Sequence, residues 1–181
     1  MSARLIRKDS VYCSSQVQDL LQSLFAAEFI YPSSTLWLVS AWVSDIPVLD
    51  NTGMSFSAVS SRWGPRKLRL SEVLVELAVQ GSTVIVVTND DLHNEGFKQR
   101  LAMKADRVGV SGRVHVFERE ELHTKALLGD AYYLDGSMNF TQNGIQVNDE
   151  TISLVLDMDD VQRARIDYLE RYKPPGLVGQ Q

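Results

Sequence analysis

The chain alternates between short, nearly continuous apolar runs and longer segments in which apolar residues recur at helical spacing. Residues 35–43 (TLWLVSAWV), 83–88 (TVIVVT) and 151–156 (TISLVL) have the pattern of strands covered on both faces. Between them, the periodicity predicts helices over about 14–29, 71–80 and 92–107, and a last one that starts at about 159. Helices alternating with buried strands predict an α/β sandwich with a mixed central sheet flanked by helices.

The remaining segments give weaker patterns. Residues 113–118 alternate between polar and apolar and predict another strand, whereas residues 1–12 indicate an irregular or edge-strand arm. Residues 44–57 contain Asp, Pro, Asn and Gly and favour a loop or a weak insert, with a short element expected at 56–59. These patterns leave the connections of the sheet undetermined.

The composition is that of a globular protein with a proper core. The chain has 181 residues, of which 44% are hydrophobic and 23% are charged. Pro174, Pro175 and Gly176 interrupt the last helical pattern. We therefore expect a single domain over residues 1–173 and a flexible tail over residues 174–181.

Charge and cysteine content limit the partners and the compartment. The formal net charge of −5 excludes a uniformly basic surface, so a polyanionic partner would need a local basic patch. Cys13 is the single cysteine, so no intrachain disulfide can form. The N-terminal residues lack an apolar leader, and the longest apolar run, 36–43, is too short to cross a bilayer. We expect a cytoplasmic protein without a membrane anchor.

The segment 123–150 contains most of the candidate chemistry. His123 and Lys125 are two residues apart in a predicted strand, which places both side chains on one face. Gly129 and Asp130 have turn chemistry, and residues 131–134 predict a returning strand, so the two strands form a hairpin. An imidazole, an ammonium and the carboxamide of Asn139 together would make an anion site that contains a nucleophile.

The order of these residues resembles the HKD motif of the phospholipase D superfamily. The match consists of His123-x-Lys125-x4-Asp130, then Gly136-Ser137-x-Asn139, and an acidic residue at Glu150. The family usually has one more residue between the Asp and the Gly-Ser pair, so the hairpin is expected to be one residue tighter. The candidate catalytic residues are thus His123, Lys125, Asp130, Ser137, Asn139 and Glu150.

The resemblance implies a role for each of these residues. His123 would attack phosphorus and form a phosphohistidine that water then hydrolyses. Lys125 and Asn139 would hold the non-bridging oxygens, with the Ser137 hydroxyl nearby. Glu150 would lie behind an imidazole and fix its tautomer. Asp130 is expected to hold the hairpin turn instead of contacting phosphate.

The same chemistry requires a second imidazole, which protonates the leaving oxygen. The chain has no second motif, and neither His93 nor His115 has a Lys and an Asp at the required spacing. We interpret both as structural or exposed. The second catalytic histidine is therefore expected to be His123 of another copy, in a homodimer with a shared active site on its two-fold axis.

A short basic cluster is the clearest candidate for contact with a polyanion. Arg62, Arg66, Lys67 and Arg69 lie within eight residues without an acid among them, and Trp63 could stack on a base or a ribose. The alternative is a solvated lead-in to the next helix with Trp63 in the core. The sequence leaves both interpretations open.

The function predicted from this resemblance is a metal-independent phosphodiesterase, most simply a nuclease that hydrolyses DNA. No metal or cofactor is expected, because Asp45 and Asp50 lack a histidine or a third close carboxylate. The chain is also similar to phospholipase D-like proteins of anti-phage defence, restriction and DNA-modification clusters, which implies further subunits as partners. The alternatives are a phospholipid hydrolase or phosphatidyltransferase, and a dimeric subunit that binds phosphate or nucleic acid without turnover.

Overall fold

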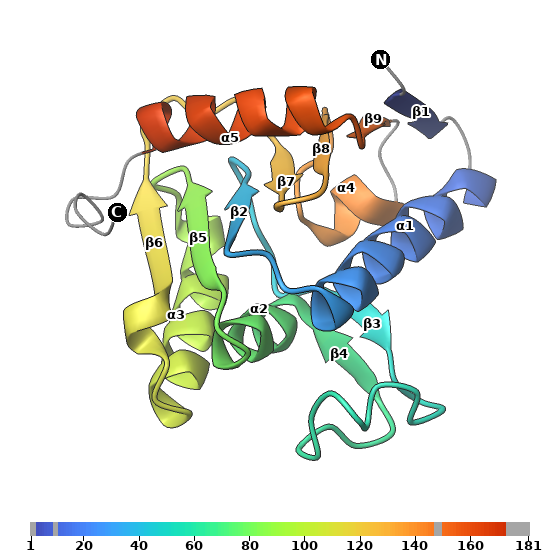
Figure 1. Cartoon of the computed structure of the whole chain (residues 1–181), viewed down its shortest axis with the longest axis vertical. Helices are drawn as coiled ribbons and strands as arrows, with labels where there is room; N and C mark the ends of the chain where they lie inside the picture. Colours follow the sequence, from blue (N-terminus) through green and yellow to red (C-terminus); the bar gives the residue numbers. More distant parts are fainter. Residues whose placement is uncertain (1–2, 9–10, 147–149, 173–181) are drawn as a thin grey trace.

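A seven-stranded mixed sheet forms the centre of the molecule (Figure 1). The structure is a computed structural model that describes residues 3–8, 11–146 and 150–172. From one edge of the sheet to the other, the strands are β1 (Ala3–Lys8), β9 (Glu150–Val155), β8 (Tyr133–Gly136), β7 (Ala126–Leu128), β2 (Thr35–Val39), β5 (Thr83–Thr88) and β6 (Val114–Glu118). The predicted α/β architecture with a mixed sheet is confirmed.

The sheet has a parallel part and an antiparallel part. β2, β5 and β6 run parallel, and Val87 of β5 pairs with Val39 of β2 and Phe117 of β6. β7 runs antiparallel to β2, and β8, β9 and β1 continue the antiparallel pairing to the far edge. Because β7 is reversed, its first residues lie beside the carboxyl ends of the parallel strands. One end of the sheet therefore collects the segments after β2 and β5 and the segment before β7.

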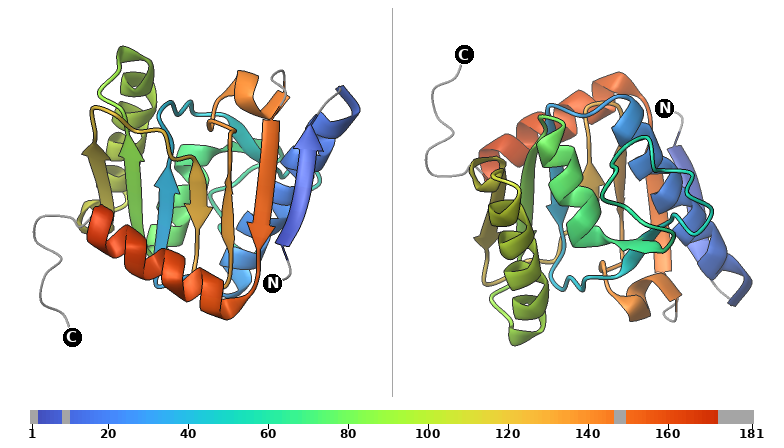
Figure 2. Two further views of the ribbon diagram at one scale, coloured as in Figure 1. Left: turned by 90° about the horizontal axis from the view of Figure 1, so that it is seen from above. Right: turned by 90° about the horizontal axis from the view of Figure 1, so that it is seen from below.

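Helices cover both faces of this sheet (Figure 2). α5 (Met158–Arg171) crosses one face, where Val161 and Tyr168 pack with Trp37 and Ile85 of the sheet. α1 (Val11–Ile30), α2 (Leu70–Val79) and α3 (Leu92–Arg107) cover the other face and enclose the larger apolar core. The continuous apolar runs in the sequence thus belong to strands that are buried on both sides, as expected for parallel strands in such a fold.

The predicted helices and strands are present, with shifted ends. The predicted strand 35–43 forms β2, which ends at Val39. The backbone nitrogens of residues 42 and 43 bond to side-chain amide oxygens instead of to a neighbouring strand. The predicted loop 44–57 contains β3 (Pro47–Asp50), which pairs antiparallel with β4 (Lys67–Arg69) in a separate small sheet. Residues 55–59 form turns.

Three further findings complete the comparison with the sequence. α4 (Gln142–Gln146) and the 3-10 helix η1 (Ser111–Arg113) are additional short elements. The N-terminal arm includes an edge strand, β1. The predicted tail 174–181 lies outside the described residues.

The turn between β7 and β8 is anchored at the end of the sheet opposite the first residues of β7. Asp130 accepts hydrogen bonds from the backbone nitrogen and hydroxyl of Ser34, at 2.8 and 3.1 Å, and forms an ion pair with Arg165 of α5. The buried Glu28 of α1 accepts from Ser33 nitrogen and Oγ at 2.8 and 2.7 Å, and burial raises the pKa of this carboxyl group. A Cβ atom on Gly129 would lie 2.6 Å from the Glu28 carboxylate, so a larger residue there would have to displace buried side chains. These contacts fix the hairpin relative to both helical layers.

Candidate active site

Five of the six candidate catalytic residues lie at one end of the sheet. His123 and Lys125 directly precede β7, Ser137 and Asn139 follow β8, and Glu150 begins β9. The arrows in Figure 2 show that this is also the end at which β2, β5 and β6 terminate. Ligand sites of α/β sheets generally form outside the carboxyl ends of the parallel strands, where the strand order changes direction.

Lys125 is positioned by the pairing of β7 with β2. Val39 pairs with Ala126 at the end of the register, and Lys125 is the next residue outward, in the segment that precedes β7. The Lys125 ammonium group donates a hydrogen bond to the backbone oxygen of His123 at 2.6 Å. The His123 side chain is exposed, and its ring makes no hydrogen bond or ion pair with the described residues. The exposed residue His123 and the ammonium group of Lys125 therefore belong to the same segment at this end of the sheet.

Asn139 is held so that its amide nitrogen remains available. Its Oδ1 atom accepts hydrogen bonds from Ser40 Oγ at 3.1 Å and from the backbone nitrogen of Trp42 at 3.4 Å. Because the oxygen faces these donors, Nδ2 points away from them, and it has no hydrogen-bond partner among the described residues. An amide N–H in this position, beside the segment of Lys125, can donate to a phosphoryl oxygen.

Ser137 is tied to the start of β9. Its backbone nitrogen donates to the oxygen of Thr151 at 3.0 Å, and its hydroxyl accepts from the nitrogen of Thr151 at 3.0 Å. The same hydroxyl donates to the carboxylate of Glu150, which is only 9% exposed. Within the described residues Glu150 is thus paired with Ser137, and its expected place behind an imidazole stays a prediction.

Gly136 makes this close approach between β8 and β9 feasible. Its φ of +155° and its position leave no room for a side chain, because an added Cβ would lie 2.0 Å from the backbone oxygen of Thr151. The Gly-Ser pair of the motif therefore has a packing function. Glycine lets the two backbones approach, and the following serine forms the hydrogen bonds that join them.

Asp130 does not belong to this group. It lies at the other end of β7 and β8, where it contacts Ser34 and Arg165. Its inclusion among the catalytic candidates is therefore not supported by its position, whereas the expectation that it holds the hairpin agrees with these contacts.

The sequence analysis missed several residues that build the site. Asn89 accepts a hydrogen bond from the backbone nitrogen of Leu122 at 3.0 Å and thereby holds the segment that leads to His123. The fully buried Asn94 donates to the oxygens of Ala41 and Asn89 and accepts from the nitrogen of Val43. A signal was present, because Asn89 follows a buried apolar strand directly, a typical position for residues at a ligand site.

The two other histidines occupy different places: His93 lies at the same end of the sheet, in the segment after β5, whereas His115 lies within β6. His93 is exposed near the start of α3, and its Nε2 atom lies 2.9 Å from Ser44 Oγ. His115 is on β6 and stacks against Phe117, with ring centroids 6.4 Å apart. Neither ring contacts His123 among the described residues.

The structure corrects the interpretation of Trp63. Its side chain is only 5% exposed and packs edge to face against Phe29, with ring centroids 5.4 Å apart. The ring is part of the apolar core, although Trp63 also lines a groove beside Arg62 and Arg66. The alternative in which Trp63 belongs to the core is thus the one that the structure supports.

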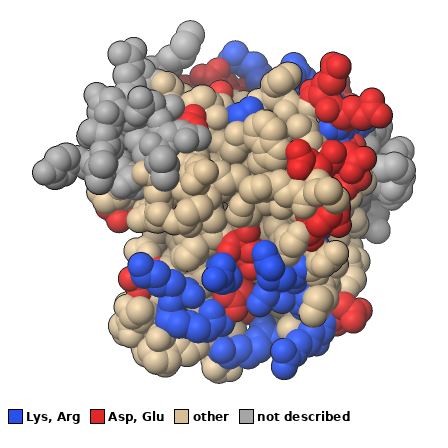
Figure 3. Space-filling model, turned by 180° about the vertical axis from the view of Figure 1, so that it is seen from behind, with Lys and Arg blue, Asp and Glu red and all other residues tan. Residues whose placement is uncertain are grey.

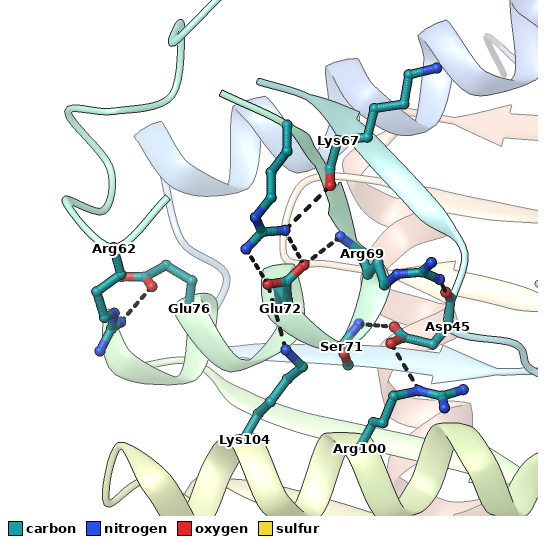
Figure 4. A network of polar contacts seen from close by, with 10 residues as sticks. Asp45, Arg62, Lys67, Arg69, Ser71, Glu72, Glu76, Arg100 and Lys104 are labelled. Atoms are coloured by element: carbon teal, nitrogen blue, oxygen red, sulfur yellow. Dashed lines mark hydrogen bonds and ion pairs between the residues drawn. The ribbon is translucent and has the colours of Figure 1, made fainter. Parts of the chain in front are cut away.

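The arginines of the same cluster are fixed by acidic groups (Figure 4). Arg62 forms an ion pair with Glu76 at 2.6 Å, and Arg66 binds both carboxylate oxygens of Glu72 at 2.6 and 2.8 Å. Arg69 donates to the backbone oxygen of Asp45 at 2.5 Å. Lys67 extends away from this network and makes no ion pair within the described residues.

Glu72 shows how strongly these charges interact. Burial alone acts to raise its pKa, but hydrogen bonds from Arg66 and from the backbone of Arg69, together with the charge of Lys104, lower it to about 2. The carboxylate therefore stays ionised at all ordinary pH values and keeps the surrounding cations in place.

α3 extends this basic cluster. Arg100 contacts the buried carboxylate of Asp45 at 3.2 Å, Lys104 lies 3.5 Å from Glu72, and Arg107 lines a groove of about 300 Å³ with Arg62 and Arg66. We call the resulting surface the basic face; it consists of Arg62, Arg66, Lys67, Arg69, Arg100, Lys104 and Arg107. Three acidic groups are interleaved with these seven cations. Figure 3 shows Lys and Arg gathered on the lower part of one side, around a smaller acidic group.

Two general properties concern the described residues only. They contain no group of three or more His, Cys, Asp and Glu side chains arranged to hold a metal ion. None of their helices has the length and apolar character needed to pass through a bilayer.

Comparison with known proteins agrees with the fold and with the predicted superfamily. A family model described as cardiolipin synthase, PLD-like domain, matches residues 50–171. The structure is similar to NucT from Helicobacter pylori, with a TM-score of 0.60, 12% identity, and coverage of 95% of this chain and 96% of that chain. It is also similar to Nuc from Salmonella typhimurium, a phospholipase D family member, with a TM-score of 0.60, 12% identity, and coverage of 94% and 93%. No curated protein matches the sequence.

A further similarity connects the chain to one part of a larger enzyme. The polyphosphate kinase of Porphyromonas gingivalis matches with a TM-score of 0.60 and 16% identity, over 99% of this chain but only 27% of that chain. These solved structures share an α/β fold with this chain. The family model matches most of the length of this chain, and this match shows that the chain belongs to the phospholipase D superfamily.

We predict that Gly136→Ala destabilises the protein by about 1–3 kcal/mol, because the new methyl group must displace the backbone of Thr151. Chemical denaturation measures the change. Gly112→Ala is the matched control, since a Cβ at Gly112 meets nothing within 4 Å. Equal stability of the two variants would contradict the packing function assigned to Gly136.

Proposed function

We propose that this chain is a metal-independent phosphodiesterase that hydrolyses nucleic acid, with DNA as the favoured substrate. The observation that carries the proposal is the grouping of His123, Lys125 and Asn139 at one end of the sheet. Membership in the phospholipase D superfamily supports the reaction class, and the fold shared with two nucleases over nearly their whole length supports the substrate class.

In the proposed first step, the neutral imidazole of His123 attacks phosphorus. The bond to the leaving oxygen breaks, and the phosphoryl group becomes attached to the ring. The Lys125 ammonium and the Asn139 amide nitrogen stabilise the charge on the non-bridging oxygens. Water then attacks the phosphohistidine and gives its proton to the imidazole that had protonated the leaving oxygen; the phosphorus–nitrogen bond breaks, and the enzyme returns to its starting form.

Departure of the alkoxide requires a proton from a second imidazole, which must be cationic while the first is neutral. Because the ring of His123 is exposed and unpaired within the described residues, it can face the same residue of a second copy. A two-fold dimer would thereby provide both imidazoles from one motif. Glu150 is held by Ser137 in the single chain, and its assignment to an imidazole stays a prediction.

The basic face supports nucleic acid as the substrate. It concentrates seven cations on a protein of net charge −5, and four of them lie in the segment 62–69 for which contact with a polyanion was predicted. Asp45, which is bound by Arg69 and Arg100, is adjacent in the chain to Ser44, the partner of His93 near the sheet end. A phosphodiester backbone could therefore extend from the active site onto this face.

A lipid substrate is the alternative, and the family description, which refers to cardiolipin synthase, favours it specifically. Parallel assays with an oligonucleotide and with phospholipid vesicles distinguish the two substrates. A role in anti-phage defence or restriction, further subunits, binding without turnover and a cytoplasmic location stay predictions from the sequence.

The proposed reaction predicts that His123→Ala lowers the cleavage rate of oligonucleotides by several orders of magnitude, because both catalytic imidazoles are lost. The assay is performed in excess EDTA, since the charge at phosphate is assigned to Lys125 and to imidazolium. His115→Ala is the control and should retain activity. Wild-type cleavage that requires an added divalent ion, or near-normal activity of His123→Ala, would refute this mechanism.

The shared site predicts a dimer in which each copy supplies one catalytic histidine. Sedimentation at micromolar concentration should show two chains. Adding excess His123→Ala chains to the wild type, with time for subunit exchange, should lower its activity because mixed dimers lack one imidazole. Excess His115→Ala chains should not have this effect. Full activity at concentrations where only monomer is present would rule out the shared site.

The basic face predicts a salt-dependent contribution to binding. Lys67 and Arg107 are the suitable positions, because neither makes an ion pair within the described residues. Replacing both with Gln should weaken binding of unrelated DNA sequences alike and reduce the slope of log K against log salt by up to about two. Arg163→Gln, on α5, is the control. An unchanged slope would show that the face does not contact the backbone.

A further inference from the structure

Trp42 differs from the two other tryptophans of the chain. Trp37 and Trp63 are buried, at 1% and 5% exposure, whereas the side chain of Trp42 is 42% exposed. An exposed apolar residue alone is common on protein surfaces and needs no function. The contacts and position of this ring distinguish it.

The indole ring is fixed by a hydrogen bond at its edge. Its Nε1 atom donates to Asp91 Oδ2 at 3.0 Å, while Oδ1 of the same carboxylate accepts from the backbone nitrogen of His93 at 2.8 Å and caps α3. These two hydrogen bonds, first that from His93 and then that from Trp42, lower the pKa of Asp91. The carboxylate remains ionised at neutral pH, so the ring stays attached to a rigid helix start.

The backbone beneath the ring is fixed as well. The backbone oxygen of Trp42 accepts from Ser40 Oγ at 2.9 Å, and its nitrogen donates to Asn139 Oδ1 at 3.4 Å. Buried Asn94 binds the residues on either side of Trp42. A partly exposed aromatic ring that is held at its edge and at its backbone has little entropy to lose when a ligand stacks on it.

Its position relates this ring to the active site. The backbone nitrogen of Trp42 donates to Oδ1 of the phosphate-binding candidate Asn139, so this residue belongs to the same end of the sheet as the candidate phosphate-binding groups. In a nucleic acid, each phosphate is flanked by nucleosides whose bases have flat apolar faces. Aromatic side chains in proteins that bind single strands commonly stack on such faces without sequence preference.

We infer that Trp42 is a stacking platform for a nucleobase next to the phosphate that is cleaved, a role that rests on the proposed nuclease function. The groups beside it are Ser44, Asp91 and His93, which suit the polar edge of a base and the adjoining sugar. Insertion into a lipid layer would instead carry the ionised Asp91 toward hydrocarbon, which is costly.

A double-mutant cycle measures this contact directly. Wild type and Trp42→Ala are compared on a single-stranded oligonucleotide and on the same oligonucleotide with one abasic site beside the cleaved bond. With the intact strand, Trp42→Ala should lower kcat/KM by about 5- to 100-fold. With the abasic strand, the two proteins should be equal within about twofold. Trp42→Phe should retain most of the wild-type kcat/KM on the intact strand.

Fluorescence provides a measurement that does not depend on turnover. Because Trp42 is the one exposed tryptophan, acrylamide should quench mainly its emission. Binding of the intact oligonucleotide to the His123→Ala variant should protect this emission, and the abasic strand should protect it less. Leu92→Ala is the control for a general apolar contact, since Leu92 is 89% exposed and adjacent to Asp91.

The outcomes separate this inference from the proposed function. If the wild type cleaves oligonucleotides but Trp42→Ala is equally impaired on both strands, or not impaired, the stacking role is overturned. Loss of the dimer in Trp42→Ala, protection by vesicles of phosphatidylcholine and phosphatidylglycerol alone, or an equal effect of Leu92→Ala would also overturn it. If the wild type cleaves no nucleic acid and binds none, the proposed function itself fails.

Discussion

The hydroxyl group of Ser40, fully buried where β2 ends, joins the two halves of the active site. It donates toward the backbone oxygen of Trp42 and toward Oδ1 of Asn139, and it accepts from the backbone nitrogen of Phe140. One polar atom thus links the parallel part of the sheet to the segment that follows β8. A buried hydroxyl without these partners would be costly, so the contacts also determine where β2 stops.

This link explains why the catalytic candidates form one group although they come from different strands. Ser40 follows β2, whose last residue pairs with the residue after Lys125, and it binds Asn139, while Gly136 permits the approach that places Ser137 at the start of β9. At the opposite end, Asp130 and Glu28 hold the hairpin against α5 and α1. The hairpin is therefore fixed at both ends, and its register cannot shift without breaking one of these two sets of contacts.

The basic face shows how an acidic protein can present a concentrated positive surface. Three of its arginines are held by carboxylates, Arg62 by Glu76, Arg66 by Glu72 and Arg100 by Asp45. The carboxylates reduce the net charge of the surface but also order the guanidinium groups. Contacts with phosphates would then require less loss of side-chain entropy than contacts made by mobile chains.

The sequence by itself determined the fold class, the order of most elements and the catalytic candidates, because these depend on local periodicity and on short spacing. The buried runs 83–88 and 151–156 and the polar helix 92–107 are present close to their predicted ends. Tertiary structure decided the rest. The core position of Trp63, the pairing of β3 with β4 and the hydrogen bonds of Asn89 and Asn94 join residues that are remote in the chain. A local pattern shows that a side chain is apolar or polar, but only the assembled fold decides which groups it meets and whether water still reaches it.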